Sequence, residues 1–281
     1  MRILITGGGG MLGQDVARAG GAASHEVIAL SHAELDITDA AAVHDATATA
    51  KPEVVINCAA WTNVDGAEEH EREASEVNGT GAGHVARAAT AAQAWTLHVS
   101  SDYVFDGSKH APYLESDPTC PLSAYGRSKL AGELEVAREA PTRHTVVRSS
   151  WLFGVGGPCF PATILRLAAE RDELSVVDDQ LGCPTFTLHL AGALLALAQR
   201  RPRGVVHVAG GGSCSWFQFA TEIVHAAGLQ CDVRPCHTED MPRPAPRPAY
   251  SVLVSERGDA PPALPHWREG LAEYMAARVS P

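Results

Sequence analysis

The chain has 281 residues, of which 45% are hydrophobic and 20% charged, and its formal net charge is −11. This length and composition are typical of a globular protein of one or two domains with a large core. The acidic balance, without any basic run, argues against a nucleic-acid surface, because such a surface must neutralise phosphates.

The start of the chain predicts a nucleotide-binding turn. A short apolar run over residues 1–6 stops at Gly7, and Gly10 and Gly13 follow before a helical stretch. Strand, glycine turn and helix form the context of a dinucleotide fingerprint. Glycine is needed there because a side chain would hold a pyrophosphate away from the backbone amides and the positive end of the helix. The spacing differs from the common Gly-x-Gly-x-x-Gly, and a purely structural loop is the alternative interpretation.

The second expected strand, residues 25–30, bears on the choice of cofactor. It ends at Ser31-His32, with Glu34 and Asp36 slightly further on. A carboxylate directly at this end would hold the ribose 2′-hydroxyl of NAD and oppose the 2′-phosphate of NADP. No carboxylate stands at the most direct position, and no arginine is found there that could bind a 2′-phosphate. We therefore expect NADPH as the cofactor, with NADH tolerated.

Further apolar strands at 53–60, 95–101 and 145–150 alternate with Ala-rich helical stretches. This alternation predicts an α/β fold, a Rossmann-type doubly wound parallel sheet with helices on both faces. Ligands of such sheets bind at the carboxyl ends of the strands. The residues at or just beyond these ends are Gly7, Ala59, Ala60, Ser100, Ser101, Ser149, Ser150 and Trp151.

The domain organisation follows from the same pattern. Residues 1–150 are expected to form the NAD(P)-binding domain, with its sheet completed by about 186–210, where 205–209 is a returning strand. Residues 151–185 and 211–281 are expected to form a smaller substrate-binding lobe over the strand ends. Apolar residues at helical spacing predict a final helix from about Trp267 to Arg278.

The pair Tyr125 and Lys129 has the spacing of a proton-transfer device. Residues four apart share one face of a helix, so the phenol and the ammonium can converge on one ligand. A nearby cation favours the phenolate and lowers a tyrosine pKa from its usual value of about 10. A surface pair is the alternative at this spacing, and the neighbouring motifs decide between the two.

Those motifs resemble the extended short-chain dehydrogenase/reductases, and within them the dTDP-4-dehydrorhamnose reductases. The first is Ser-Ser-Asp-Tyr-Val-Phe-Asp-Gly at 100–107, about twenty residues before Tyr125. The others are Asn-Cys-Ala-Ala-Trp-Thr-Asn-Val-Asp at 57–65, Asp-Gln-Leu-Gly-Cys-Pro-Thr at 179–185 and the Arg-Pro-rich stretch 243–253. The resemblance runs nearly end to end.

The resemblance implies NADPH-dependent reduction of the C4 ketone of dTDP-4-dehydro-L-rhamnose to dTDP-L-rhamnose. Tyr125 would act as the general acid, and Lys129 would lower the tyrosine pKa and hold the nicotinamide ribose. Ser101 would donate a hydrogen bond to the developing oxyanion. The other expected substrate contacts are Asp102 and Trp151. The residues expected to bind the cofactor are Gly7, Gly10, Met11, Leu12, Gly13, Ser31, Asp36, Ile37, Ala59, Ala60, Trp61, Thr62, Tyr125 and Lys129.

Arg243 and Arg247 are candidates for binding the diphosphate of the sugar nucleotide, with a solvated Pro-rich turn as the alternative. Two departures from the family pattern stand out. Ser101 replaces the usual threonine and keeps the hydroxyl. Cys159 stands before Phe160 where many members have asparagine, and a thiol cannot replace the hydrogen bonds of an amide. This second change leaves the exact sugar open.

Seven scattered cysteines without a Cys-x-x-Cys spacing fit a reducing cytoplasm rather than a disulfide framework. Cys231, Cys236 and His237 lack a fourth ligand, so no metal site is expected. The apolar stretch 190–198 is shorter than the about 20 residues of a membrane span, so it predicts a buried helix and no membrane partner. The oligomeric state stays open, with a homodimer as one possibility.

Three other functions compete with the reductase. A nucleotide-sugar 4,6-dehydratase typically has an Asp-Glu pair beside the active-site hydroxyl, but here Asp102 is followed by Tyr103. A 4-epimerase would keep its NAD tightly bound through turnover. The third alternative is a non-catalytic subunit, since the regulatory subunit of methionine adenosyltransferase belongs to this family. The intact Ser101, Tyr125 and Lys129 favour an enzyme.

Overall fold

The computed structural model describes residues 1–279, and its centre is a six-stranded sheet in which every neighbouring pair is parallel. The strand order is β10-β5-β4-β3-β1-β2. The strands are β1 (Arg2–Thr6), β2 (Glu26–Leu30), β3 (Val54–Asn57), β4 (Trp95–Ser101), β5 (His144–Ser149) and β10 (Gly204–His207). The predicted parallel α/β fold is therefore confirmed, including the return of the segment near 205–209 to the same sheet.

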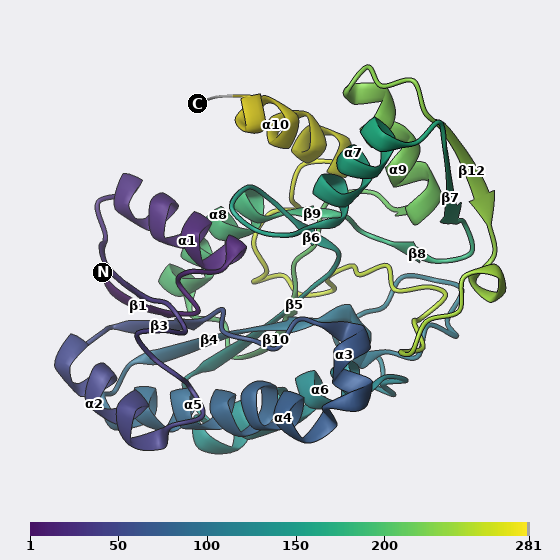
Figure 1. Cartoon of the computed structure of the whole chain (residues 1–281). Helices are drawn as coiled ribbons and strands as arrows, with labels where there is room; N and C mark the ends of the chain where they lie inside the picture. The colour runs from purple at the N-terminus through teal and green to yellow at the C-terminus, as the bar shows by residue number, and fades with distance from the viewer. Residues whose placement is uncertain (280–281) are drawn as a thin grey trace.

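Helices cover both faces of this sheet (Figure 1). Helices α1 (Met11–Ala22) and α8 (Thr187–Arg200) lie on one face. On the opposite face lie α2 (Ala40–Ala50), α5 (Ala82–Ala91) and α6 (Ala124–Glu139). The short elements α3 (Val64–Glu69), α4 (Glu71–Ser75) and the π-helix η1 (Glu76–Gly81) precede α5, and the 3-10 turn η2 (Asp102–Val104) follows β4.

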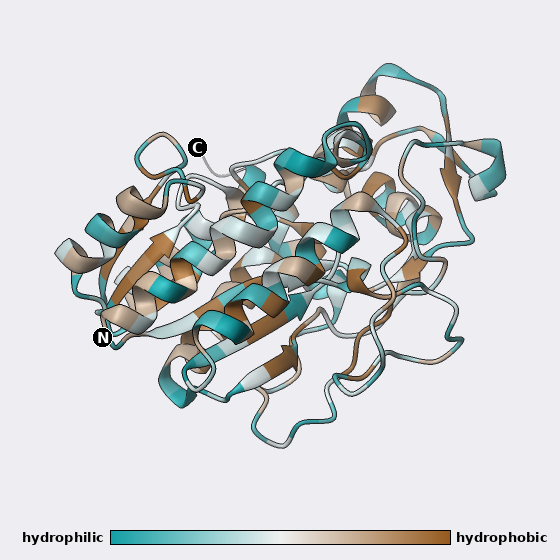
Figure 2. Ribbon diagram, turned by 90° about the horizontal axis from the view of Figure 1, so that it is seen from below, coloured by the Kyte–Doolittle hydropathy of each residue, from teal (hydrophilic) through white to brown (hydrophobic). Residues whose placement is uncertain are grey.

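The alternation of side chains along β1 shows why both faces need cover. Ile3 and Ile5 pack in one cluster with residues of α1 and α8. Leu4 points to the other face and packs with residues of α2 and α5, because successive residues of a strand face opposite sides. The strands are the hydrophobic interior of the molecule, beneath helices of mixed hydropathy (Figure 2).

The remaining elements form a smaller lobe. They are β6 (Leu152–Phe153), α7 (Phe160–Glu170), β7 (Glu173–Val177), β8 (Leu181–Gly182), β9 (Thr185–Phe186), β11 (Cys214–Ser215), α9 (Trp216–Ala226), β12 (Asp232–Cys236), η3 (Thr238–Asp240) and α10 (Trp267–Val279). Three two-stranded pairs, β6–β9, β7–β12 and β8–β11, replace a continuous sheet. A separate aromatic core, built around Phe153, Phe219, Trp267 and Tyr274, holds this lobe together. The predicted final helix is α10.

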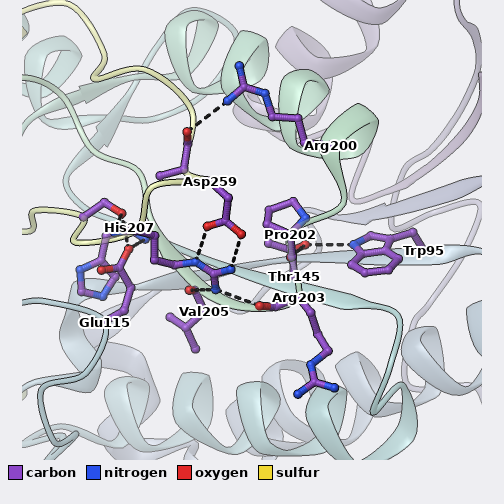
Figure 3. Close-up of polar contacts among 12 residues, drawn as sticks. Trp95, Glu115, Thr145, Arg200, Pro202, Arg203, Val205, His207 and Asp259 are labelled. Atoms are coloured by element: carbon purple, nitrogen blue, oxygen red, sulfur yellow. Dashed lines mark hydrogen bonds and ion pairs between the residues drawn. The ribbon is translucent and has the colours of Figure 1, made fainter.

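The open edge of β10 is covered by side chains of distant loops. Arg257 donates to the carbonyl oxygens of Arg203 and Val205 at 2.8 Å each, and the Glu115 carboxylate accepts from the His207 N–H at 2.8 Å (Figure 3). An uncovered strand edge is a template for pairing with another chain. These contacts satisfy the Val205 carbonyl and the His207 N–H of this edge strand.

Among residues 1–279, the helices are either too short or too polar to cross a membrane.

Candidate functional site

A cleft of about 1210 Å³ opens at the carboxyl ends of the central strands. The chain order reverses between β1 and β3, since β2 lies to one side of β1 and β3–β5 lie to the other. Such a switch point is where open parallel sheets bind their ligands. The cleft exceeds the usual 300–1,000 Å³ of a small-molecule pocket. It is large enough for a dinucleotide and a second ligand together.

The glycine turn forms one end of the cleft. Gly7 has φ +71°, and a Cβ there would lie 2.5 Å from the Ala59 backbone nitrogen. A Cβ on Gly13 would lie 2.3 Å from the Gly7 carbonyl oxygen. Helix α1 begins at Met11 behind Gly10, which offers no capping side chain. Its first amide groups therefore remain for a ligand, and the positive helix end suits a pyrophosphate.

The turn after β2 brings a carboxylate back to the end of that strand. Glu34 Oε2 accepts hydrogen bonds from the Ser31 N–H at 2.8 Å and from the Ser31 hydroxyl at 2.7 Å. The sequence predicted that Glu34 lies beyond the end of β2, away from the position that contacts the ribose. The Ser-x-x-Glu spacing of a capping box is the signal that could have revealed this contact. Ser31 and Asp36 line the same end of the cleft.

Tyr125 and Ser101 meet near the centre of the cleft. Ser123 caps the start of α6 by accepting the Gly126 N–H at 3.1 Å, which places Tyr125 in the first turn. Ser101 ends β4, and its hydroxyl donates to Asp102 Oδ1 at 3.0 Å and lies close enough to the Tyr125 phenol to influence its pKa. Burial raises the pKa of Tyr125 to about 12, the Ser101 hydroxyl opposes this shift, and the Asp102 charge adds to it. The phenol is therefore protonated at neutral pH.

Lys129 follows one turn later on α6 and lies at the floor of the cleft. The residue is 2% exposed, and its ammonium donates to the Val99 carbonyl oxygen at 2.7 Å. Burial lowers the pKa of Lys129 to about 8, against the charges of Glu133 and Cys58. The net shift of the Tyr125 pKa is upward because burial dominates it. The expected lowering by Lys129 therefore stays a prediction. A protonated phenol is the form that a proton donor requires.

The sequence did not predict a role for Glu133, which lies on α6 one turn after Lys129 and helps to position it. Its carboxylate forms a buried bidentate pair with Arg148, with Nε–Oε1 and Nη2–Oε2 distances of 2.9 and 2.7 Å. Glu133 also accepts the Ser100 hydroxyl at 2.5 Å. The pair fixes α6 against β4 and β5, and so sets the position of Lys129 relative to Ser101. The spacing of four residues between Lys129 and Glu133 could have indicated this, because it places both side chains on one face of the helix.

Asp102 has a buried carboxylate oxygen without a partner in the site. It is 2% exposed, and its Oδ2 lacks a hydrogen-bond partner among residues 1–279. Burial raises the pKa of Asp102 to about 7, while the Ser251 and Ser101 hydroxyls lower it. Buried polar atoms normally have partners, so this oxygen is prepared for donors that a ligand brings.

The cleft assembles most of the residues that the sequence singled out, from both lobes. Its lining includes the expected residues Gly7, Gly10, Met11, Leu12, Gly13, Ser31, Asp36, Ile37, Ala59, Ala60, Thr62, Ser101, Asp102, Tyr125, Lys129 and Trp151. Phe160 and Trp216 also line it, and sequence reasoning missed their place in the site.

Three expected site residues lie outside this lining. The indole nitrogen of Trp61 donates to the Asn63 carbonyl oxygen at 2.9 Å. Arg243 and Arg247 both pair with Asp65, at 3.4 and 2.9 Å. Their roles toward a ligand stay predictions.

A family model described as RmlD substrate binding domain matches residues 1–279. The chain is 44% identical over 284 residues to a dTDP-4-dehydrorhamnose reductase of Streptomyces griseus, covering 98% of this chain and 93% of that protein. A crystal structure of a dTDP-4-dehydrorhamnose reductase from Clostridium acetobutylicum superimposes with a TM-score of 0.95, at 41% identity over 99% of both chains. The Bacillus anthracis reductase, solved in complex with NADP, also gives a TM-score of 0.95, at 36% identity over 98% of this chain and 99% of that one.

Proposed function

Because the chain belongs to the dTDP-4-dehydrorhamnose reductase family, we propose that it reduces the C4 ketone of dTDP-4-dehydro-L-rhamnose to form dTDP-L-rhamnose. One observation carries this proposal. Tyr125, Ser101 and Lys129 line the same cleft as the glycine turn, so a proton donor lies within one cavity with an anion-binding helix end. A binding subunit would not need that arrangement.

NADPH is the proposed cofactor, as in the similar structure that was solved with NADP. When bound, it supplies the hydride. The glycine turn and the free amides of α1 fit its pyrophosphate, since these amides lack a capping side chain. The proposed cofactor residues are Gly7, Gly10, Met11, Leu12, Gly13, Ser31, Asp36, Ile37, Ala59, Ala60, Thr62, Tyr125 and Lys129. Glu34 is an argument for testing NADH as well, because a carboxylate at the end of β2 opposes a 2′-phosphate.

The reaction needs a proton on the carbonyl oxygen as negative charge develops there. Tyr125 is protonated at neutral pH and would donate this proton. Ser101 would donate a hydrogen bond to the same oxygen, a form of stabilisation often worth about 3 kcal/mol. The ammonium of Lys129 would stabilise the tyrosinate that remains, since an opposite charge nearby favours the charged form. Asp102 would accept hydrogen bonds from sugar hydroxyls.

We also propose the wider setting of this reaction. Residues 1–150 with the segment 186–210 would hold the cofactor, and residues 151–185 and 211–281 would hold the sugar. The seven cysteines are free thiols, which supports work in a reducing cytoplasm. Leu134 on α6 is 64% exposed and offers an apolar contact for a second copy. Light scattering over a concentration series would test the homodimer.

The proposed function is tested by following NADPH absorbance with enzymatically generated dTDP-4-dehydro-L-rhamnose, and then repeating the assay with NADH. Oxidation that depends on the sugar and disappears in Tyr125→Phe is the expected result. Protein that binds NADPH but leaves it unoxidised would contradict the proposal. Such a protein would then be offered other dTDP-4-keto sugars, because Cys159, which departs from the family pattern, stands between Pro158 and Phe160 of the cleft lining.

A further inference from the structure

An aromatic wall, made of Trp151, Trp216 and Phe160, forms one side of the cleft. The rings of Trp151 and Trp216 are stacked with centroids 3.5 Å apart and an interplanar angle of 6°. Phe160 packs on Trp216 at 4.5 Å. Trp216 and Phe160 are the first residues of α9 and α7, so the C-terminal lobe supplies the support for Trp151.

The backbone of Trp151 is held in an unfavourable conformation. Its φ is +48°, in the left-handed region that bulky residues rarely adopt. Strain of this kind persists only where surrounding contacts impose it, and it gathers at ligand sites. Gly182 leaves room for the ring, since a Cβ there would lie 2.3 Å from Trp151 Cε2. The stacking on Trp216, the strained backbone of Trp151 and the absence of a Cβ at Gly182 therefore all help to position the Trp151 indole.

The wall lies beside the reaction centre. Ser149 is the register partner of Ser101 in the parallel sheet, and Trp151 follows it by two residues. Asp102, with its unpaired Oδ2, provides a polar group near the same point. The cleft thus offers a polar flank and an aromatic flank around Tyr125. A 4-keto-6-deoxyhexose has matching flanks, with hydroxyl groups at C2 and C3 and a methyl group at C6.

We propose that Trp216 is a specificity-determining residue, which holds Trp151 in place and so favours a nucleoside-diphosphate hexose with a methyl group at C6 over one with a C6 hydroxyl. The inference rests on the proposed function and adds the residue that selects this feature of the substrate. An apolar wall gains from contact with a methyl group but offers few partners to a hydroxyl, which loses water on binding. Hydrophobic pockets discriminate against an added hydroxyl by about 100-fold at most.

The test compares two alcohols in the reverse direction, with NADP⁺ as the oxidant. They are dTDP-L-rhamnose and its C6-hydroxylated analogue, dTDP-L-mannose. We expect wild-type kcat/KM to favour the 6-deoxy sugar by about 10- to 100-fold. Trp216→Ala should reduce this ratio to below about threefold, mainly through kcat/KM for dTDP-L-rhamnose. Trp216→Phe should restore at least half of the ratio on a logarithmic scale, because it keeps an aromatic ring against Trp151.

Gly182→Ala is a second variant that should disturb the Trp151 indole, and it leaves Trp216 unchanged. The added methyl group should displace Trp151 and lower the ratio as Trp216→Ala does. Gly192→Ala is the matched control, because a Cβ at Gly192 meets no atom within 4 Å. Trp95→Phe is the control for loss of an indole outside the cleft, where Trp95 Nε1 donates to Thr145 Oγ1. Both controls should keep the wild-type ratio.

The outcomes separate this inference from the proposed function. Wild-type protein that oxidises neither sugar would contradict both. An active wild type whose ratio survives in Trp216→Ala and Gly182→Ala would overturn the inference alone. Equal losses for both sugars, with the same loss of dTDP binding, would place the wall against the nucleobase and would also overturn it.

Discussion

Arg247 and Asp65 are separated by 182 positions in the chain and form a bidentate ion pair, with Nη1–Oδ1 and Nη2–Oδ2 distances of 3.0 and 2.9 Å. Asp65 also accepts the Ala245 N–H at 3.2 Å. The carboxylate therefore fastens the Pro-rich segment 241–249 to the first turn of α3, next to the cleft. The candidates for diphosphate binding are held in place by the last residue of the 57–65 motif, a contact that the sequence did not predict.

Breaking this pair should loosen the segment 241–249. Burial raises the pKa of Asp65, but the Arg247 and Ala245 hydrogen bonds and the charges of Arg247 and Arg243 outweigh it and hold the pKa below its usual range. A lowered carboxyl pKa stabilises the fold above the unfolded value of about 3.9, and this stability is lost as the pH falls. We expect Asp65→Asn to reduce the free energy of unfolding by about 1–2 kcal/mol at pH 7. Urea denaturation at pH 7 and at pH 3.5 would measure the difference, which should shrink at the lower pH.

Asp65→Asn, Arg247→Gln and the double variant complete a thermodynamic cycle for this contact. The coupling energy should be at least about 0.5 kcal/mol, because the two groups share hydrogen bonds. Additive single effects would show that the pair contributes nothing to stability.

Tyr125→Phe should lower kcat by about 100- to 10,000-fold, because the reaction loses its proton donor. NADPH binding should stay nearly unchanged, since the phenyl ring is kept. Stopped-flow NADPH oxidation and a fluorescence titration of the cofactor measure the two effects separately. Turnover close to that of the wild type would remove Tyr125 from the role of general acid.

The Ser101 hydroxyl should matter more than the methyl group that distinguishes serine from threonine. Ser101→Ala is expected to lose about 100-fold in kcat, as for one missing oxyanion donor. Ser101→Thr should keep activity within a few-fold, because it retains the hydroxyl. A steady-state comparison of the three proteins decides the point, and equal rates in all three would exclude a role for Ser101.

Asp102 should impose a trade-off between stability and activity. Its pKa of about 7 lies above the unfolded value of about 3.9, so the folded state binds the extra proton between these values. Stability from this site is therefore present at low pH and lost as the pH rises through 7. Asp102→Asn removes the ionisation, and its melting temperature should exceed that of the wild type by more at pH 8 than at pH 5.

The kinetics of Asp102→Asn provide a second, independent readout. The wild-type kcat/KM should show an inflection near pH 7, as the carboxylate that accepts sugar hydroxyls forms. This inflection should be absent in the variant. The kcat/KM of the variant at pH 8 should also be lower than that of the wild type. An unchanged pH profile would assign the inflection to another group.

Gly13→Ala tests the glycine turn with a matched control on the same helix. The added Cβ would lie 2.3 Å from the Gly7 carbonyl oxygen, so the turn must move. We expect the Kd for NADPH to rise at least about tenfold, because the backbone approach to the pyrophosphate is lost. Gly21→Ala, where a Cβ meets no atom within 4 Å, should leave the Kd unchanged.

The local sequence was sufficient to predict the parallel sheet. Short apolar runs such as residues 3–5 and 54–56 became buried strands because they have no polar face to expose. Their carboxyl ends in a parallel sheet must lie at one edge, so Ser101 and the glycine turn could be placed together from chain order. The position of Tyr125 also followed, because a helix fixes the face on which residues four apart lie.

Only the tertiary structure decided the contacts between distant segments. The stack of Trp151 on Trp216 depends on where the start of α9 lies relative to the turn that follows β5. The periodicity within one segment does not predict that arrangement. The same holds for the ion pair of Asp65 and Arg247. Even the direction of the Tyr125 pKa shift required the fold, because desolvation depends on every neighbour, whereas the sequence revealed one nearby cation. Local spacing thus determined the elements and the placing of Tyr125 and Lys129 on one helix, and long-range packing determined their electrostatics and the walls of the cleft.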